Sequence, residues 1–143
     1  FVPVKDPGDL SRPMVGRAAA YADIDNDGDL DILISQNGRR AMLFRNDQQL
    51  GHHWLRIRLV GKAPNRNAIG ARVELTAGGM TQTRDVMPAR SFLSQMELPL
   101  TFGLGEHDRI DTLRINWPDG SSQSLTTVEI DTTTTIIQPG AEP

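Results

Sequence analysis

The sequence predicts an all-β protein, and three observations support this prediction. Short apolar segments alternate with glycine- and proline-containing turns along most of the 143 residues. Several of these segments alternate apolar and polar residues with the period of two that is typical of a half-buried strand. No convincing amphipathic helix occurs after residue 45. Many short strands joined by such turns favour an antiparallel β-sandwich or barrel for most of the chain.

The first 50 residues predict a three-stranded meander, which we treat as a separate domain, 1–50. Its alanine-rich first segment could form a helix, but seven residues make only a marginal helix in water. The second segment is a clear strand because Leu30, Ile32 and Ile34 fall on one face. The segments are residues 18–24, 30–36 and 41–45, the last two joined by a tight Asn-Gly turn. So small a sheet hardly buries a face alone, and we expect it to pack on the rest of the chain.

The second predicted domain, residues 51–143, begins at Gly51 with a strand rich in apolar residues and arginine. Trp54 and Trp117 lie at apolar strand positions, where we expect both to pack in a core. The elements predicted after the first strand are a loop at 61–70, a hairpin at 72–87, a short apolar segment at 101–105, a strand at 112–117 returning through 121–128, and a final strand at 132–137.

The strongest chemical signal is a run of five aspartates within nine residues, in the pattern D-x-D-x-D-G-x-x-D. Calcium takes about six to eight oxygen ligands, and carboxylates at loop positions 1, 3, 5 and 9 supply most of them. Gly28 at position 6 permits the sharp turn around the ion. We therefore predict calcium as the cofactor, bound by the side chains of Asp23, Asp25, Asp27 and Asp31 and by the backbone carbonyl of Asp29.

Two other interpretations of this loop are an acidic turn and an EF-hand. A plain acidic turn needs one or two acids, and Asn-Asp-Gly is turn chemistry in its own right. An EF-hand requires a glutamate at position 12, but position 12 counted from Asp23 is Ile34, within a predicted strand. The loop thus leads into a sheet, and the pattern favours binding over catalysis.

Composition excludes some classes of partner and leaves the compartment open. The net charge of −3 is too small to indicate a nucleic-acid partner. No apolar run approaches the length of a membrane span, and the absence of cysteine says little about compartment. The beginning, Phe1-Val2-Pro3-Val4, does not resemble a signal peptide. We expect this sequence to be a fragment whose signal peptide lies upstream in the parent protein.

Two sets of motifs resemble known families. Residues 16–22, the aspartate loop and the strand after it resemble one FG-GAP/VCBS repeat, a blade of integrin-α-like β-propellers. The second part is similar to the ASPIC and UnbV domain of the cartilage acidic protein-like family. The motifs on which this resemblance rests include Ile69-Gly70-Ala71-Arg72-Val73, Phe102-Gly103-Leu104-Gly105 and Trp117-Pro118-Asp119-Gly120, in that order. The resemblance implies the final propeller-type repeat and C-terminal domain of a larger extracellular or cell-surface protein.

Together these features predict a calcium-binding, non-catalytic recognition or adhesion module. No catalytic constellation is present in the sequence, and the partner is an unidentified protein or glycan. The exposed face of the repeat is also expected to support a homodimer. Two alternatives stay open: a carbohydrate-binding module, against which the aromatic content of 5% argues mildly, and an accessory domain of an enzyme whose active site lies upstream.

Overall fold

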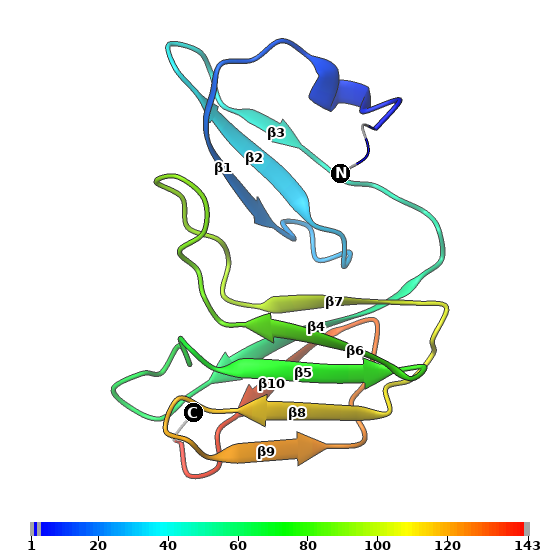
Figure 1. Cartoon of the computed structure of the whole chain (residues 1–143), viewed down its shortest axis with the longest axis vertical. Coiled ribbons are helices and arrows are strands. Elements are labelled where there is room, and N and C mark those ends of the chain that lie inside the picture. Colours follow the sequence, from blue (N-terminus) through cyan, green and yellow to red (C-terminus); the bar gives the residue numbers. More distant parts are fainter. Residues whose placement is uncertain (1, 3, 142–143) are drawn as a thin grey trace.

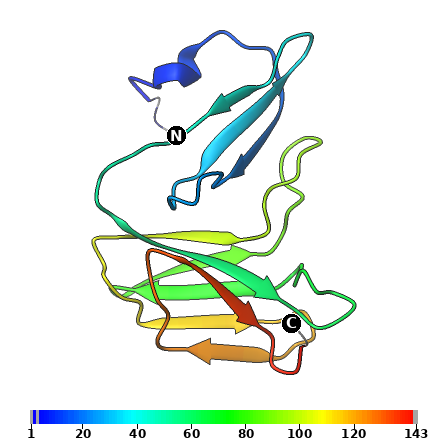
Figure 2. The ribbon, with the colours of Figure 1, turned by 180° about the vertical axis from the view of Figure 1, so that it is seen from behind.

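The computed structural model describes residues 2 and 4–141, and it is elongated with two stacked parts (Figure 1). Over these residues it contains one 3₁₀ turn, η1 (Gly8–Ser11), and ten strands in three sheets. One sheet forms the N-terminal part, and the other two form the C-terminal part (Figures 1 and 2). The all-β prediction is confirmed.

The N-terminal sheet is the predicted three-stranded meander. It consists of β1 (Gly16–Ala22), β2 (Asp31–Gln36) and β3 (Met42–Phe44), in the order β1-β2-β3 with antiparallel pairing. The alanine-rich segment is a strand, since Ala20 pairs with Leu33 and Ala22 with Asp31. Pairing with a neighbouring strand has overridden the helix propensity of alanine, which is weak over so few residues.

The C-terminal part is a sandwich of two sheets. One has the order β10-β4-β7, formed by β10 (Thr133–Ile137), β4 (His53–Val60) and β7 (Leu100–Gly105). The other has the order β6-β5-β8-β9, formed by β6 (Met80–Asp85), β5 (Arg72–Ala77), β8 (Thr112–Asn116) and β9 (Ser122–Leu125). Among the described residues neither sheet closes into a barrel. Strands β10 and β4 run parallel, which departs from the predicted antiparallel pairing.

The sandwich encloses one apolar core drawn from both sheets. Leu55 and Ile57 of β4 face Leu75 of β5 and Ile115 of β8, and all four side chains are fully buried. Trp117 belongs to the same cluster, as predicted. Trp54 does not belong to that cluster, because alternation along β4 puts it on the opposite face of the sheet from Leu55 and Ile57.

The N-terminal sheet has no comparable core. Among its described residues up to residue 50, only Asp23, Gly28 and Asp31 are buried, and all three belong to the aspartate loop or its ends. Leu33 and Leu43 remain 48% and 56% exposed on one face of the sheet. The sheet is therefore held in place mainly where its loop meets the sandwich.

This unequal burial predicts unequal costs for two leucine truncations. Leu75→Ala should lower the free energy of unfolding by about 2–5 kcal/mol, because it opens a cavity in a closed core. Leu33→Ala should cost less than about 1 kcal/mol, because half of that side chain already meets water. Urea denaturation followed by tryptophan fluorescence measures both. Equal costs would contradict the division into a core-bearing sandwich and a coreless sheet.

Candidate metal centre

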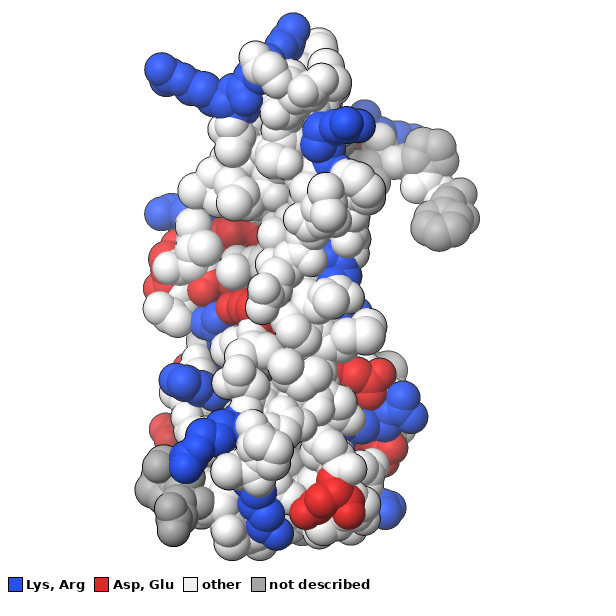
Figure 3. Space-filling view, turned by 90° about the vertical axis from the view of Figure 1, so that its left-hand side faces the viewer, with Lys and Arg blue, Asp and Glu red and all other residues white. Residues whose placement is uncertain are grey.

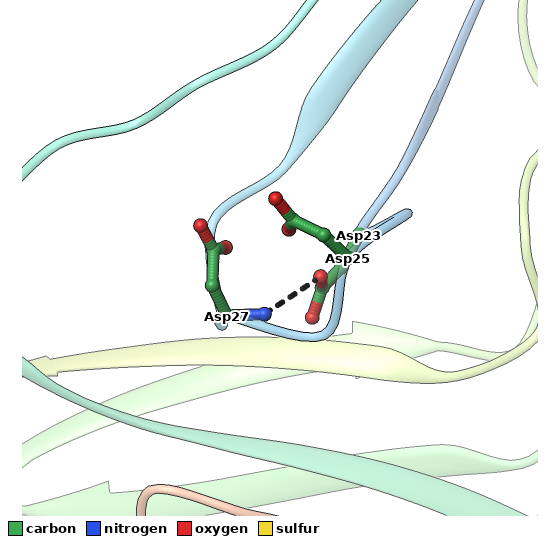
Figure 4. Close-up of side chains that lie close together, drawn as sticks. All are labelled: Asp23, Asp25 and Asp27. Carbon is green, nitrogen blue, oxygen red and sulfur yellow. Dashed lines mark hydrogen bonds between the residues drawn. The ribbon is translucent and has the colours of Figure 1, made fainter.

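Three of the five predicted aspartates converge in the loop between β1 and β2. Asp23, Asp25 and Asp27 each offer one carboxylate oxygen, and these oxygens all lie within 4.8 Å of one another (Figure 4). Asp25 and Asp27 are exposed, whereas Asp23 is buried. Acidic atoms gather midway along the molecule, at the level where the two parts meet (Figure 3). The loop thus presents converging oxygen donors at an accessible position.

Two residues in the left-handed region of φ turn the loop, and the sandwich supports the turn from below. Asn26 has φ 62° and Gly28 has φ 94°. A Cβ atom built on Gly28 would lie 2.3 Å from the indole ring of Trp54 on β4. Glycine is therefore required twice here, by its backbone conformation and by this close approach. One face of Trp54 consequently serves as the platform for the loop.

Asp23 is held by the backbone of its own loop. Its Oδ1 accepts a hydrogen bond from the Asp27 backbone N–H at 3.2 Å (Figure 4). Its Oδ2 accepts one from the Gly28 N–H, also at 3.2 Å. The side chain is completely buried. Buried carboxylates require such partners because desolvation of an unpaired charge is costly. The backbone of the loop therefore fixes the orientation of the Asp23 side chain.

The other two predicted aspartates take different positions. Asp31 is 2% exposed, and its carboxylate accepts hydrogen bonds from the Ile24 N–H at 3.0 Å and the Asn46 N–H at 2.8 Å. It thereby ties the loop to the segment after β3. The Asp29 carboxylate accepts from Gln48 Nε2 at 2.6 Å, so its side chain is engaged elsewhere. The predicted roles of Asp31 as a side-chain ligand and Asp29 as a carbonyl ligand stay predictions.

A buried arginine reaches the loop from the sandwich, and sequence reasoning did not assign it to the site. Arg56 on β4 is 6% exposed. Its Nη1 donates to Asp23 Oδ2 at 3.1 Å and to Asn26 Oδ1 at 2.9 Å, and its Nη2 donates to Glu97. Burial raises the pKa of Glu97, and the neighbouring charge of Arg56 offsets this only in part. No local sequence pattern marks Arg56, because an arginine between apolar residues also fits a solvated strand face.

The electrostatics of the exposed carboxylates favour a cation. Partial desolvation and the negative charge of Asp27 raise the pKa of Asp25, against the lowering effect of Arg45, whose Nη1 lies 3.6 Å from Asp25. Asp27 Oδ1 accepts the Asp29 N–H at 2.9 Å. Hard oxygen donors crowded on a glycine turn are the donor type that a calcium ion takes, and three of them converge here. The residues present therefore suit the predicted metal.

Outside the loop, His53 makes a side-chain contact with Asp131. Its Nδ1 lies 2.7 Å from Asp131 Oδ2, and the Trp54 N–H donates to the other oxygen of that carboxylate at 3.0 Å. Burial would raise the pKa of Asp131, but these two hydrogen bonds and the nearby imidazole lower it. The contact fastens the turn before β10 to the beginning of β4.

Fold and site together define a β-sandwich that carries an acidic loop on a small additional sheet. Residues 61–143 match the family model described as ASPIC and UnbV, and the chain belongs to this family. It is 33% identical over 146 residues to cartilage acidic protein 1 of Xenopus tropicalis, covering 97% of this chain and 22% of the relative. It is 30% identical over 148 residues to cartilage acidic protein 1 of Mus musculus and of Homo sapiens, covering 96% of this chain and 22% of each.

The chain therefore spans about a fifth of the length of these curated relatives. Within the described residues, no helix has the length and apolar character that crossing a membrane requires. The family match begins at residue 61, just after β4 ends. Strand β4 nevertheless lies between β10 and β7 in the sheet, so the structural sandwich extends ahead of the matched residues.

The contact between Gly28 and Trp54 predicts a specific effect of adding one methyl group. Gly28→Ala should destabilise the protein by about 1 kcal/mol from its positive φ and by a further 1–3 kcal/mol, roughly, from overpacking against the indole. Gly38→Ala is the matched control, because Gly38 has φ 68° and open space around it. Its cost should stay near the backbone contribution alone.

Urea denaturation followed by circular dichroism measures both variants. Repeating the Gly28→Ala substitution in a Trp54→Ala background removes the obstacle, so the additional cost should disappear there. Equal destabilisation by Gly28→Ala and Gly38→Ala would show that the loop does not rest on Trp54.

Proposed function

We propose that this chain is a calcium-binding, non-catalytic recognition or adhesion module within a larger extracellular protein. The observation that carries the proposal is the convergence of Asp23, Asp25 and Asp27 on the glycine turn at Gly28. Calcium bound there would cancel carboxylate repulsion and lock the connection between β1 and β2. Residues Asp23, Asp25 and Asp27 would hold it through side chains, with Asp31 and the Asp29 carbonyl completing the donor set.

The identity of the relatives supports the extracellular setting. The curated relatives are named cartilage acidic protein 1, and this chain matches about a fifth of each. That name places the relatives in cartilage, which is an extracellular setting, and we extend this setting to the present chain. The three-stranded meander with its loop fits one FG-GAP/VCBS repeat, so we assign residues 1–50 to that class as part of the proposal.

The partner is proposed to be a protein or glycan of the matrix. The two tryptophans give no support to a sugar-stacking platform. Trp117 is 3% exposed in the core, and Gly28 covers one face of Trp54. Carbohydrate recognition usually employs open aromatic faces. A protein partner is therefore favoured over a glycan among the two classes that the sequence left open.

Calorimetric titration tests the metal site. The wild type should bind one calcium ion with a dissociation constant of about 0.1–1 mM, as other extracellular modules do. Asp25→Asn and Asp27→Asn should abolish measurable binding, because each removes an anionic ligand. Asp29→Asn is the control, since the Asp29 side chain contacts Gln48 and only its backbone carbonyl is a predicted ligand. Absence of heat from the wild type up to about 10 mM calcium would contradict the proposal.

Thermal unfolding tests whether the ion is structural. At about 100 times the dissociation constant, calcium that binds only the folded chain adds roughly 2.7 kcal/mol to stability. The melting temperature of the wild type should therefore rise with calcium. Asp25→Ala should lose this response, whereas Asp9→Ala should keep it, because Asp9 pairs with Arg12 outside the loop. Identical melting of wild type and Asp25→Ala at every calcium concentration would exclude a structural site.

A further inference from the structure

We infer that Arg56 is the built-in counter-cation of the aspartate loop and sets the affinity of the loop for a divalent metal ion. This inference rests on the proposed calcium function and assigns regulation of that same site. Arg56 and the ion share one carboxylate, that of Asp23. The guanidinium allows the loop to fold without metal, and its positive charge keeps the affinity for metal low.

Burial makes this arginine electrostatically strong. The side chains of Arg56 and Asp23 are 7% and 0% exposed, and that of Glu97 is 12% exposed. Charges so placed are little screened by salt and interact more strongly than surface charges. One guanidinium faces two carboxylates in this cluster, and Asp25 and Asp27 lie beside it. The net charge of the cluster therefore remains negative with Arg56 in place, so the cluster can still attract a further cation.

Charge is the main contribution of Arg56, because the position of Asp23 is fixed by other groups. The backbone N–H groups of Asp27 and Gly28 hold both oxygens of Asp23. Removal of the guanidinium leaves these hydrogen bonds in place. It also removes a positive charge that repels an incoming ion, so the metal affinity rises.

The orientation of the guanidinium toward the loop leaves one of its own nitrogen donors unsatisfied. Arg56 Nε is buried and has no hydrogen-bond partner. An unsatisfied buried donor is unfavourable, yet both Nη atoms donate hydrogen bonds, to Asp23, Asn26 and Glu97. This arrangement indicates that contact with the loop dominates the placement of the side chain.

The same contact joins the two parts of the molecule. Arg56 belongs to β4 of the sandwich, and Asp23 and Asn26 belong to the loop of the N-terminal sheet. The ion and the sandwich therefore act on one carboxylate. Any free energy by which Arg56 weakens metal binding is matched by an equal effect of metal on the contact between loop and sandwich.

The test measures calcium affinity by calorimetry and stability in EDTA by urea denaturation, using the whole chain. Arg56→Gln should raise the calcium affinity on the order of tenfold. In EDTA it should lower the folding equilibrium constant at least about tenfold, because Asp23 and Glu97 lose their buried partner. Arg58→Gln is the matched control, since Arg58 is an exposed residue on the same strand and the substitution removes the same charge. It should leave both quantities unchanged.

A second variant keeps the test decisive if Arg56→Gln does not fold. Glu97→Gln retains Arg56 but removes its compensating charge, so calcium affinity should fall. The inference is overturned if folded Arg56→Gln shows an unchanged or reduced calcium affinity. It is also overturned if Glu97→Gln shows an unchanged or raised calcium affinity. In both cases the calcium function stands. A wild type that binds no calcium overturns both.

Discussion

The buried ion pair between Arg56 and Asp23 is the interaction on which the arrangement of the two parts depends. It places a cation of the sandwich against a carboxylate of the loop, with both side chains shielded from solvent. Such a pair gains little free energy over an apolar contact, because both charges must be desolvated. Its value lies in specificity: an alternative docking of the sheet would leave two buried charges unpaired, which costs far more than the pair gains.

Strand β4 connects the apolar core of the sandwich to the polar contact between Arg56 and the aspartate loop. Leu55, Ile57 and Leu59 point into the sandwich, whereas Trp54 and Arg56 lie on the opposite face beneath the loop. The period of two along a strand thus lets eight residues serve both purposes. The N-terminal sheet, which has little buried apolar surface, takes its position from this outer face. A residue of the C-terminal part also contacts the free edge of β1. The Tyr21 N–H donates a hydrogen bond to Met96 Sδ at 3.2 Å.

The sequence reveals local patterns well and distant pairings poorly. Alternation located nearly every strand, and the spacing of aspartates around Gly28 located the loop. Alternation does not reveal which strands become neighbours, so the parallel pairing of β10 with β4 was missed. The contact of Arg56 with Glu97 joins residues 41 positions apart, and neither residue carries a local signal. Asp31 illustrates a third limit: ligand spacing alone does not reveal that its oxygens accept backbone N–H groups.

The placement of β4 also bears on where the family domain begins as a physical unit. The family match starts at residue 61, yet Leu55 and Ile57 are fully buried in the core that the matched residues build. Without residues 53–60, β10 and β7 would lose the strand that lies between them and pairs with each. The same eight residues carry Trp54 and Arg56, which contact the loop. The sandwich and the acidic loop are therefore physically coupled through a strand that the family signature does not include.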